Sequence, residues 1–169
     1  MVVIVMGPAG SGKTTVGRRL AAALGWSFHE GDELHPPENV ALMRAGVPLG
    51  DAERAPWLAA IARLIADFVA AGTPAVITCS ALKRDYRRTL VSPTAPVGAV
   101  RFVYLRATAP LLDRRLAARR GHFFDPALLA SQLAALEEPG AHEPAPVLTL
   151  DAGADPDALV RQIRLAFDI

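Results

Sequence analysis

Residues 7–14 read Gly-Pro-Ala-Gly-Ser-Gly-Lys-Thr and directly follow the short apolar run 2–6. A strand that feeds a glycine-rich turn into a helix points successive backbone N–H groups at one spot, where a phosphate binds. We expect Lys13 to reach the β- and γ-phosphates and Thr14 to offer its hydroxyl to Mg²⁺. The stretch therefore predicts a nucleoside triphosphate site built from consecutive residues: Gly7, Pro8, Ala9, Gly10, Ser11, Gly12, Lys13, Thr14 and Thr15.

Length and composition favour one globular domain over residues 1–169, because 51% of the residues are hydrophobic and 21% are charged. The net charge of +1 gives no broad basic surface. We therefore expect a small-molecule partner rather than nucleic acid or a membrane. The single cysteine, Cys79, excludes an internal disulfide framework and is typical of a reducing compartment. A cytoplasmic location is expected, since the run 2–6 is too short to span a membrane.

Short apolar runs alternate with segments that carry apolar residues at helical spacing. The runs are 2–6, 75–79, 100–105 and 147–150, with a weaker one at 26–29. The helical segments are 13–24, 57–71, 83–91, 110–118, 126–136 and 155–167. This alternation predicts an α/β fold of the P-loop NTPase type, with a parallel sheet of about five strands between helices.

Two stretches interrupt the alternation, and such insertions at strand ends usually form binding surfaces. The first, 35–56, is rich in Pro and Gly, and we expect it to bind the acceptor of a transferred group. The second, about 119–126, is basic and aromatic. It is expected to form a movable lid with Gly121 as its hinge, in which Arg115 and Arg119 lie on one helix face.

A phosphate-binding loop alone does not distinguish a kinase from a switch or a motor. A switch GTPase would show Asp-x-x-Gly and Asn-Lys-x-Asp motifs, and an AAA-type motor would need a longer chain with an acidic pair ending a central strand. None of these is present, and the apolar run 75–79 is followed by Ser80. A carboxylate for the metal or the acceptor must then come from elsewhere. Glu30 and Asp32 are the candidates, and both would project to the same side if the strand extended that far.

The acceptor site of a phosphoryl-transfer enzyme should be cationic if the acceptor is an anion. Arg54 could bind a carboxylate or phosphate bidentately, or it could pair with Asp51, a reasonable helix N-cap. Lys83 and Arg87 are four residues apart, so a helix would present both on one face. Two cations on one face suit an anionic acceptor.

Taken together, the motifs resemble those of gluconokinase over nearly the whole chain and in the same order. The phosphate-binding loop is shared with many families, whereas Cys-Ser-Ala-Leu-Lys and Gly-His-Phe-Phe are particular to this one. The matching segments are 7–14, 31–36, 48–49, 51–58, 79–83 with 86–87, and 115–116 leading to 119–124. The resemblance implies a nucleoside-monophosphate-kinase-like fold with a lid, ATP and Mg²⁺ as cofactors, phosphorylation of D-gluconate at its terminal hydroxyl, and often a homodimer.

The resemblance also implies roles for individual residues. Asp32 would orient or deprotonate the acceptor hydroxyl, while Arg115 and Arg119 would serve the nucleotide and the transferring phosphoryl group. Lys13, Asp32 and Arg119 would then be the catalytic residues. The gluconate ligands would come from Asp32, His35, Arg54, Lys83, Arg87 and His122.

The sequence departs from the family pattern at two places. Glu53 stands where the family tends to have Asp, and the Phe-Glu pair that usually follows Gln132 is replaced by Leu-Ala. Gln132 itself is either a substrate ligand or an exposed polar residue of a helix. The alternatives are a related kinase acting on shikimate or a nucleoside monophosphate, and a nonenzymatic nucleotide-binding regulator.

Overall fold

The computed structural model describes residues 1–118 and 126–169. Within these residues one five-stranded sheet has the strand order β2-β3-β1-β4-β5, and every pairing is parallel. The strands are β1 (Val2–Met6), β2 (Ser27–Glu30), β3 (Ala75–Cys79), β4 (Val100–Arg106) and β5 (Val147–Asp151). All residues of β1 and β3 are buried, which explains why these strands are continuous apolar runs rather than alternating ones.

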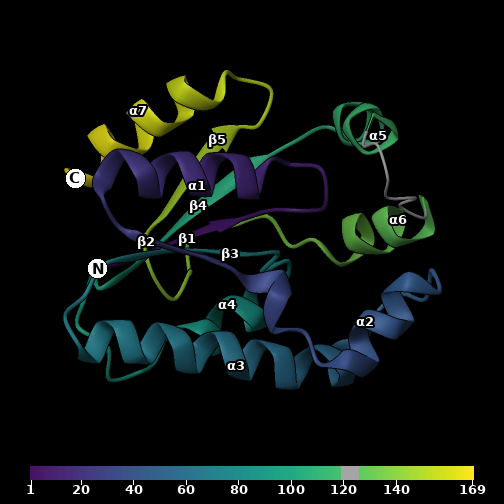
Figure 1. Ribbon diagram of the computed structural model, residues 1–169, viewed down its shortest axis with the longest axis horizontal. Coiled ribbons are helices and arrows are strands. Elements are labelled where there is room, and N and C mark those ends of the chain that lie inside the picture. Colours follow the sequence, from purple (N-terminus) through teal and green to yellow (C-terminus); the bar gives the residue numbers. More distant parts are fainter. Residues whose placement is uncertain (119–125) are drawn as a thin grey trace.

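Helices cover both faces of the sheet (Figure 1). One face carries α1 (Lys13–Leu24) and α7 (Pro156–Phe167), and the other carries α3 (Asp51–Ala70) and α4 (Arg84–Leu90). Three further helices lie beyond the carboxyl ends of the strands: α2 (Pro37–Arg44), α5 (Ala109–Ala117) and α6 (Pro126–Ala135). None of the described helices has the length and apolar character needed to cross a bilayer.

The sheet separates two apolar layers. Alternate residues of β1 point to opposite faces, so Ile4 joins the layer under α3 and α4, which also holds Trp57 and Ile61. Val5 joins the layer under α1 and α7, together with Leu20. Burial of these side chains fixes the register of the sheet and brings all the strand ends to one edge.

The predicted α/β sheet is confirmed, including the weaker fifth strand, now β2. The stretch 35–56 is more regular than predicted, because it contains α2 and the start of α3. Helix α3 is capped at Gly50, whose backbone N–H donates to Glu53 Oε2 at 2.9 Å. The prediction that Asp51 is the N-cap is therefore wrong by one residue, and Asp51 is the first residue of the helix.

Candidate active site

The phosphate-binding loop joins β1 to α1, and all three of its glycines, Gly7, Gly10 and Gly12, have positive φ. Gly10 has φ of 82°, and Gly12, the N-cap of α1, has φ of 98°. A Cβ atom on Gly10 would also lie 3.1 Å from Leu116 Cγ. Glycine is thus needed at position 10 for both its conformation and its size.

The start of α1 is open to an anion. No side chain caps it, and its first turn carries no acidic residue. The first helical hydrogen bond runs from the Val16 N–H to Gly12 O, so the N–H groups of Lys13, Thr14 and Thr15 have no acceptor within the helix. Their partial positive charge favours a phosphate at this point. Lys13 Nζ donates to Pro8 O at 3.1 Å and so lies against the same loop.

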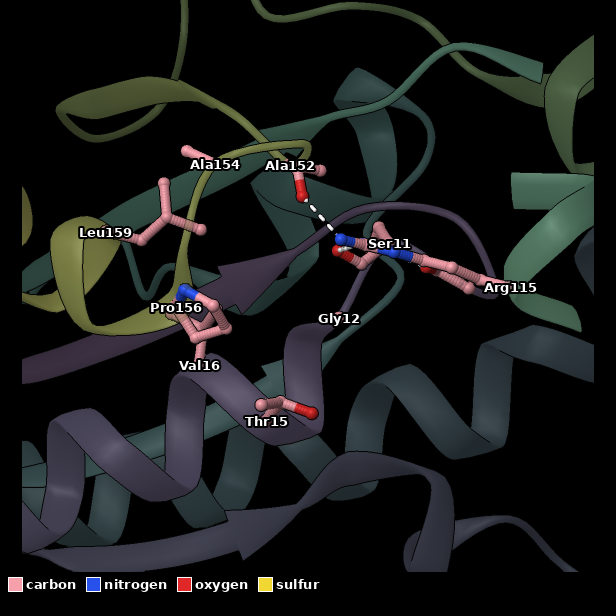
Figure 2. A pocket seen from close by; sticks show the side chains of 10 residues that line it. Ser11, Gly12, Thr15, Val16, Arg115, Ala152, Ala154, Pro156 and Leu159 are labelled. Carbon is pink, nitrogen blue, oxygen red and sulfur yellow. Dashed lines mark hydrogen bonds between the residues drawn. The ribbon is translucent and has the colours of Figure 1, made fainter. Parts of the chain in front are cut away.

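A pocket of about 280 Å³ lies beside this loop. Figure 2 shows it between Gly12 and Val16 on one side and Ala152 and Leu159 on the other. Arg115 borders it from α5, donating from Nη2 to Ala152 O at 2.8 Å and from Nη1 to Ser11 O at 3.1 Å. The predicted nucleotide residue Arg115 thus links the loop to the segment after β5.

Helices α5 and α6 both reach the phosphate-binding loop. Leu112, Leu116 and Leu129 form a small cluster against which Ala9 packs. From α6, Gln132 Oε1 accepts a hydrogen bond of 2.7 Å from the Ala9 N–H. Gln132 therefore binds the phosphate-binding loop in this structure. The alternative in which it is an exposed polar residue of a helix is wrong.

The carboxyl end of β2 approaches its neighbour β3 very closely. A Cβ atom on Gly31 would lie only 2.0 Å from Thr78 O, so no other residue fits there without a backbone shift. The Gly31 N–H donates to Thr78 Oγ1 at 3.1 Å, and the Thr78 hydroxyl donates to Glu30 Oε1. The strand ends at Glu30, so its alternation does not extend to Asp32.

Asp32 and Glu30 have different environments as a result. Glu30 is held by Thr78, whereas Asp32 is exposed and its carboxylate has no hydrogen bond or ion pair with any described residue. Trp57 Nε1 donates to Gly31 O at 2.7 Å and fixes the turn that carries Asp32. Asp32 is therefore the carboxylate that remains free to meet a ligand.

His35 stacks on Trp57, with the ring centroids 4.2 Å apart and the planes inclined by 12°. Asn39 Nδ2 donates to Glu53 O at 2.7 Å and lies 3.3 Å from His35 Nδ1. Because this amide nitrogen is a donor, Nδ1 accepts and the imidazole proton lies on Nε2. Burial lowers the pKa of His35, partly offset by Asp32, so the neutral ring is favoured. The motifs of the sequence did not single out Asn39, which links His35 to the backbone of Glu53.

Arg54 has no carboxylate partner among the described residues. Arg54 is only 8% exposed, and its Nε donates to Leu49 O at 3.2 Å. No described acidic side chain pairs with it. Asp51 pairs instead with Lys83, whose Nζ lies 2.6 Å from Oδ1 and 2.9 Å from Oδ2. The alternative in which Arg54 pairs with Asp51 is therefore wrong.

Arg87 does not face the site, although the helical spacing predicted that it would share a face with Lys83. Its side chain is 0% exposed, and it donates to Glu143 from Nε at 2.6 Å and from Nη2 at 2.8 Å. Its Nη1 also donates to Ala81 O, Leu82 O and Glu137 O. A buried guanidinium that is bound in this way has no access to a substrate, so the prediction for Arg87 is corrected to a structural role.

The predicted lid, about 119–126, falls almost wholly outside the described residues. Arg119 and His122, and with them the hinge Gly121, lie outside the described residues. Their expected roles stay predictions. In the described ranges 1–118 and 126–169, no three acidic, histidine or cysteine side chains converge as a metal site.

Comparisons with known proteins agree with this geometry. A family model described as an AAA domain matches residues 2–139, which include the phosphate-binding loop and four of the strands. A gluconokinase of Gluconobacter oxydans is 47% identical, with 95% of this chain and 88% of the relative covered. A thermoresistant gluconokinase of Escherichia coli is 38% identical, covering 84% and 79%.

Solved structures give the same answer. The crystal structure of a gluconokinase from Sinorhizobium meliloti is 40% identical with a TM-score of 0.84, covering 99% of this chain and 91% of that one. A shikimate kinase from Aquifex aeolicus shares the fold alone, at 17% identity and a TM-score of 0.58, covering 99% and 96%. Together with the loop and the strand order, these likenesses show that the chain belongs to the gluconokinase family of P-loop kinases.

Proposed function

We propose that this protein transfers the γ-phosphoryl group of ATP to the terminal hydroxyl of D-gluconate, giving 6-phospho-D-gluconate. The observation that carries the proposal is that three groups lie beyond the carboxyl ends of the parallel strands: the uncapped start of α1, Arg54 without a described carboxylate partner, and the free Asp32 carboxylate. The charges of Asp32 and Arg54 both act on the pKa of His35, so the two residues lie near the same imidazole. Ligands bind at this edge in open α/β sheets. The gluconokinase relatives support a sugar acid as the acceptor.

On the donor side, the loop amides and the N–H groups at the start of α1 would bind the phosphates. Lys13 would leave Pro8 O and reach the β- and γ-phosphates. Mg²⁺, held by the Thr14 hydroxyl and the phosphates, would neutralise charge on the triphosphate. The adenine base would occupy the pocket of about 280 Å³ beside Arg115, against Val16 and Leu159.

On the acceptor side, Arg54 would bind the carboxylate of gluconate through its free guanidinium nitrogens. Asp32 would align the terminal hydroxyl and take up its proton, while His35 Nε2–H and Lys83 would donate to the remaining hydroxyls. Positioning and charge neutralisation do most of the work in phosphoryl transfer, so this set suffices without a covalent intermediate. Arg119 and His122 would complete the site from the lid, in one domain spanning 1–169.

A coupled ADP-release assay with gluconate, shikimate and AMP tests the proposal. Gluconate should be the acceptor with the highest kcat/KM. Release of ADP only with shikimate or AMP would assign the chain to a related kinase. Nucleotide binding without turnover on any of the three would favour a regulator.

Two variants test the residue roles. Lys13→Ala should nearly abolish turnover, and unchanged activity would refute the donor site. Asp32→Asn should lower kcat more than it raises KM, because the carboxylate acts on the reacting hydroxyl. Asp157→Asn is the matched control: it removes an exposed carboxylate that pairs with Arg19 at 2.6 Å, far from the acceptor residues, and it should leave both constants unchanged.

A further inference from the structure

Lys83 is not a free cation in this structure. Both oxygens of Asp51 contact its ammonium, at 2.6 and 2.9 Å, and the Tyr86 hydroxyl donates to the same carboxylate. The Lys83 ammonium also lies 5.4 Å from the centroid of the Tyr86 ring. These three side chains form one cluster, which we call the Asp51 cluster: Asp51 from α3, Tyr86 from α4, and Lys83, the N-cap of α4.

The Asp51 carboxylate is fixed by more than its ion pair. It is the first residue of α3, where the helix dipole favours a negative charge. Hydrogen bonds from Lys83 and then Tyr86 lower the pKa of Asp51, and Asp51 in turn raises the pKa of Lys83. At neutral pH the pair is therefore fully ionised, and its two charges cancel.

The Asp51 cluster reduces the positive charge that is available to an anionic acceptor. Asp51 compensates the charge of Lys83, whereas Arg54 has no carboxylate partner among the described residues. Lys83 therefore adds no net positive charge to the acceptor end. A carboxylate carries one negative charge, whereas a phosphate monoester carries nearly two at neutral pH. The second negative charge would be repelled by Asp51, and Lys83 already pairs with that carboxylate.

We propose that Asp51 is a specificity-determining residue that makes the acceptor site select a carboxylate monoanion over a phosphate dianion. It does so by neutralising Lys83, which then serves the acceptor as a hydrogen-bond donor rather than as a second anion site. This inference rests on the proposed function and adds to it the charge that the acceptor must carry. It also predicts that a nucleoside monophosphate is a poor acceptor.

The test compares D-gluconate with D-glucitol 1-phosphate, in which a phosphate monoester replaces the carboxylate. Dissociation constants for both are measured by calorimetry for the unaltered protein and for Asp51→Asn. Removing one charge near the ligand, in a side chain that is 67% exposed, should shift the ratio of the two constants toward the phosphate by about fivefold. The shift should shrink in high salt.

Other variants separate charge from shape. Asp51→Glu keeps the charge and should keep the original ratio. Lys83→Met leaves Asp51 uncompensated, so it should move the ratio in the opposite direction, away from the phosphate. That variant keeps the inference testable if Asp51→Asn does not fold. Asp157→Asn, an exposed acid of another ion pair, should change nothing.

The outcomes also separate this inference from the proposed function. If the unaltered protein phosphorylates gluconate but Asp51→Asn and Lys83→Met both keep the original ratio within twofold, the inference is wrong and the function stands. If the unaltered protein neither binds nor phosphorylates gluconate, the proposed function fails first.

Discussion

Replacing Glu143 by Ala should destabilise the protein severely, because it leaves a charged guanidinium buried without its counterion. The Arg87 side chain is 0% exposed and that of Glu143 is 6% exposed, and two short hydrogen bonds of 2.6 and 2.8 Å join them. Each charge-assisted bond contributes about 1.5–3 kcal/mol. Breaking a buried pair by removing one partner typically costs about 3–5 kcal/mol of unfolding free energy, which agrees with two such bonds.

Urea unfolding followed by circular dichroism measures this loss directly. Thermal unfolding gives a second measure: for a chain of 169 residues each kcal/mol corresponds to about 2–4 °C in Tm, so Tm should fall by about 6–20 °C. The control Asp157→Asn removes an exposed ion pair and should change the free energy of unfolding by about 1 kcal/mol at most. If Glu143→Ala were no more damaging than this control, the reasoning about the buried pair would be refuted.

Removing both partners should not rescue the fold. Many buried ion pairs can be replaced by apolar residues without loss. Here Arg87 Nη1 also donates to the carbonyl groups of Ala81, Leu82 and Glu137, which would lose that donor. Arg87→Met combined with Glu143→Ala should therefore remain at least as unstable as Glu143→Ala alone, and a recovery to the stability of the unaltered protein would contradict this account.

Three further predictions concern other residues. Gly31→Ala should destabilise the protein by about 1–3 kcal/mol and lower kcat, because its Cβ would meet Thr78 O at 2.0 Å; Gly140→Ala, which meets only an Arg84 nitrogen at 3.9 Å, is the control in urea unfolding. Burial lowers the pKa of His35 from 6.5, so the imidazole binds a proton at higher pH in the unfolded state than in the folded state. The free energy of unfolding should therefore fall as the pH drops below 6.5. His35→Gln should flatten that part of the stability profile. Cys79 is buried with its pKa raised to about 12, so it should react with iodoacetamide only after unfolding, as mass spectrometry would show.

Apolar runs and helical spacing predicted the sheet well because both depend on local sequence. The strands β1 and β3 are buried on both faces, and their bounds agree with the runs 2–6 and 75–79. Helix α2 was missed because Pro36 and Pro37 are typical of a turn, although proline is tolerated in the first turn of a helix.

The site was harder to predict where long-range pairing decides it. Lys83 and Arg87 have the spacing of neighbours on a helix face, but Glu143, 56 residues beyond Arg87, draws the latter inward. The pairing of Asp51 with Lys83 spans 32 residues and is equally invisible to local spacing. The phosphate-binding loop, in contrast, was predictable because its function depends on backbone N–H groups within eight consecutive residues.

The two apolar layers have an evolutionary consequence. Val5 and Leu20 support the nucleotide half of the molecule, whereas Ile4 and Trp57 support the acceptor half, and the sheet keeps the two sets apart. Substitutions that reshape the acceptor half can therefore accumulate without repacking the donor half. The fold itself is kept by the shikimate kinase from Aquifex aeolicus at only 17% identity.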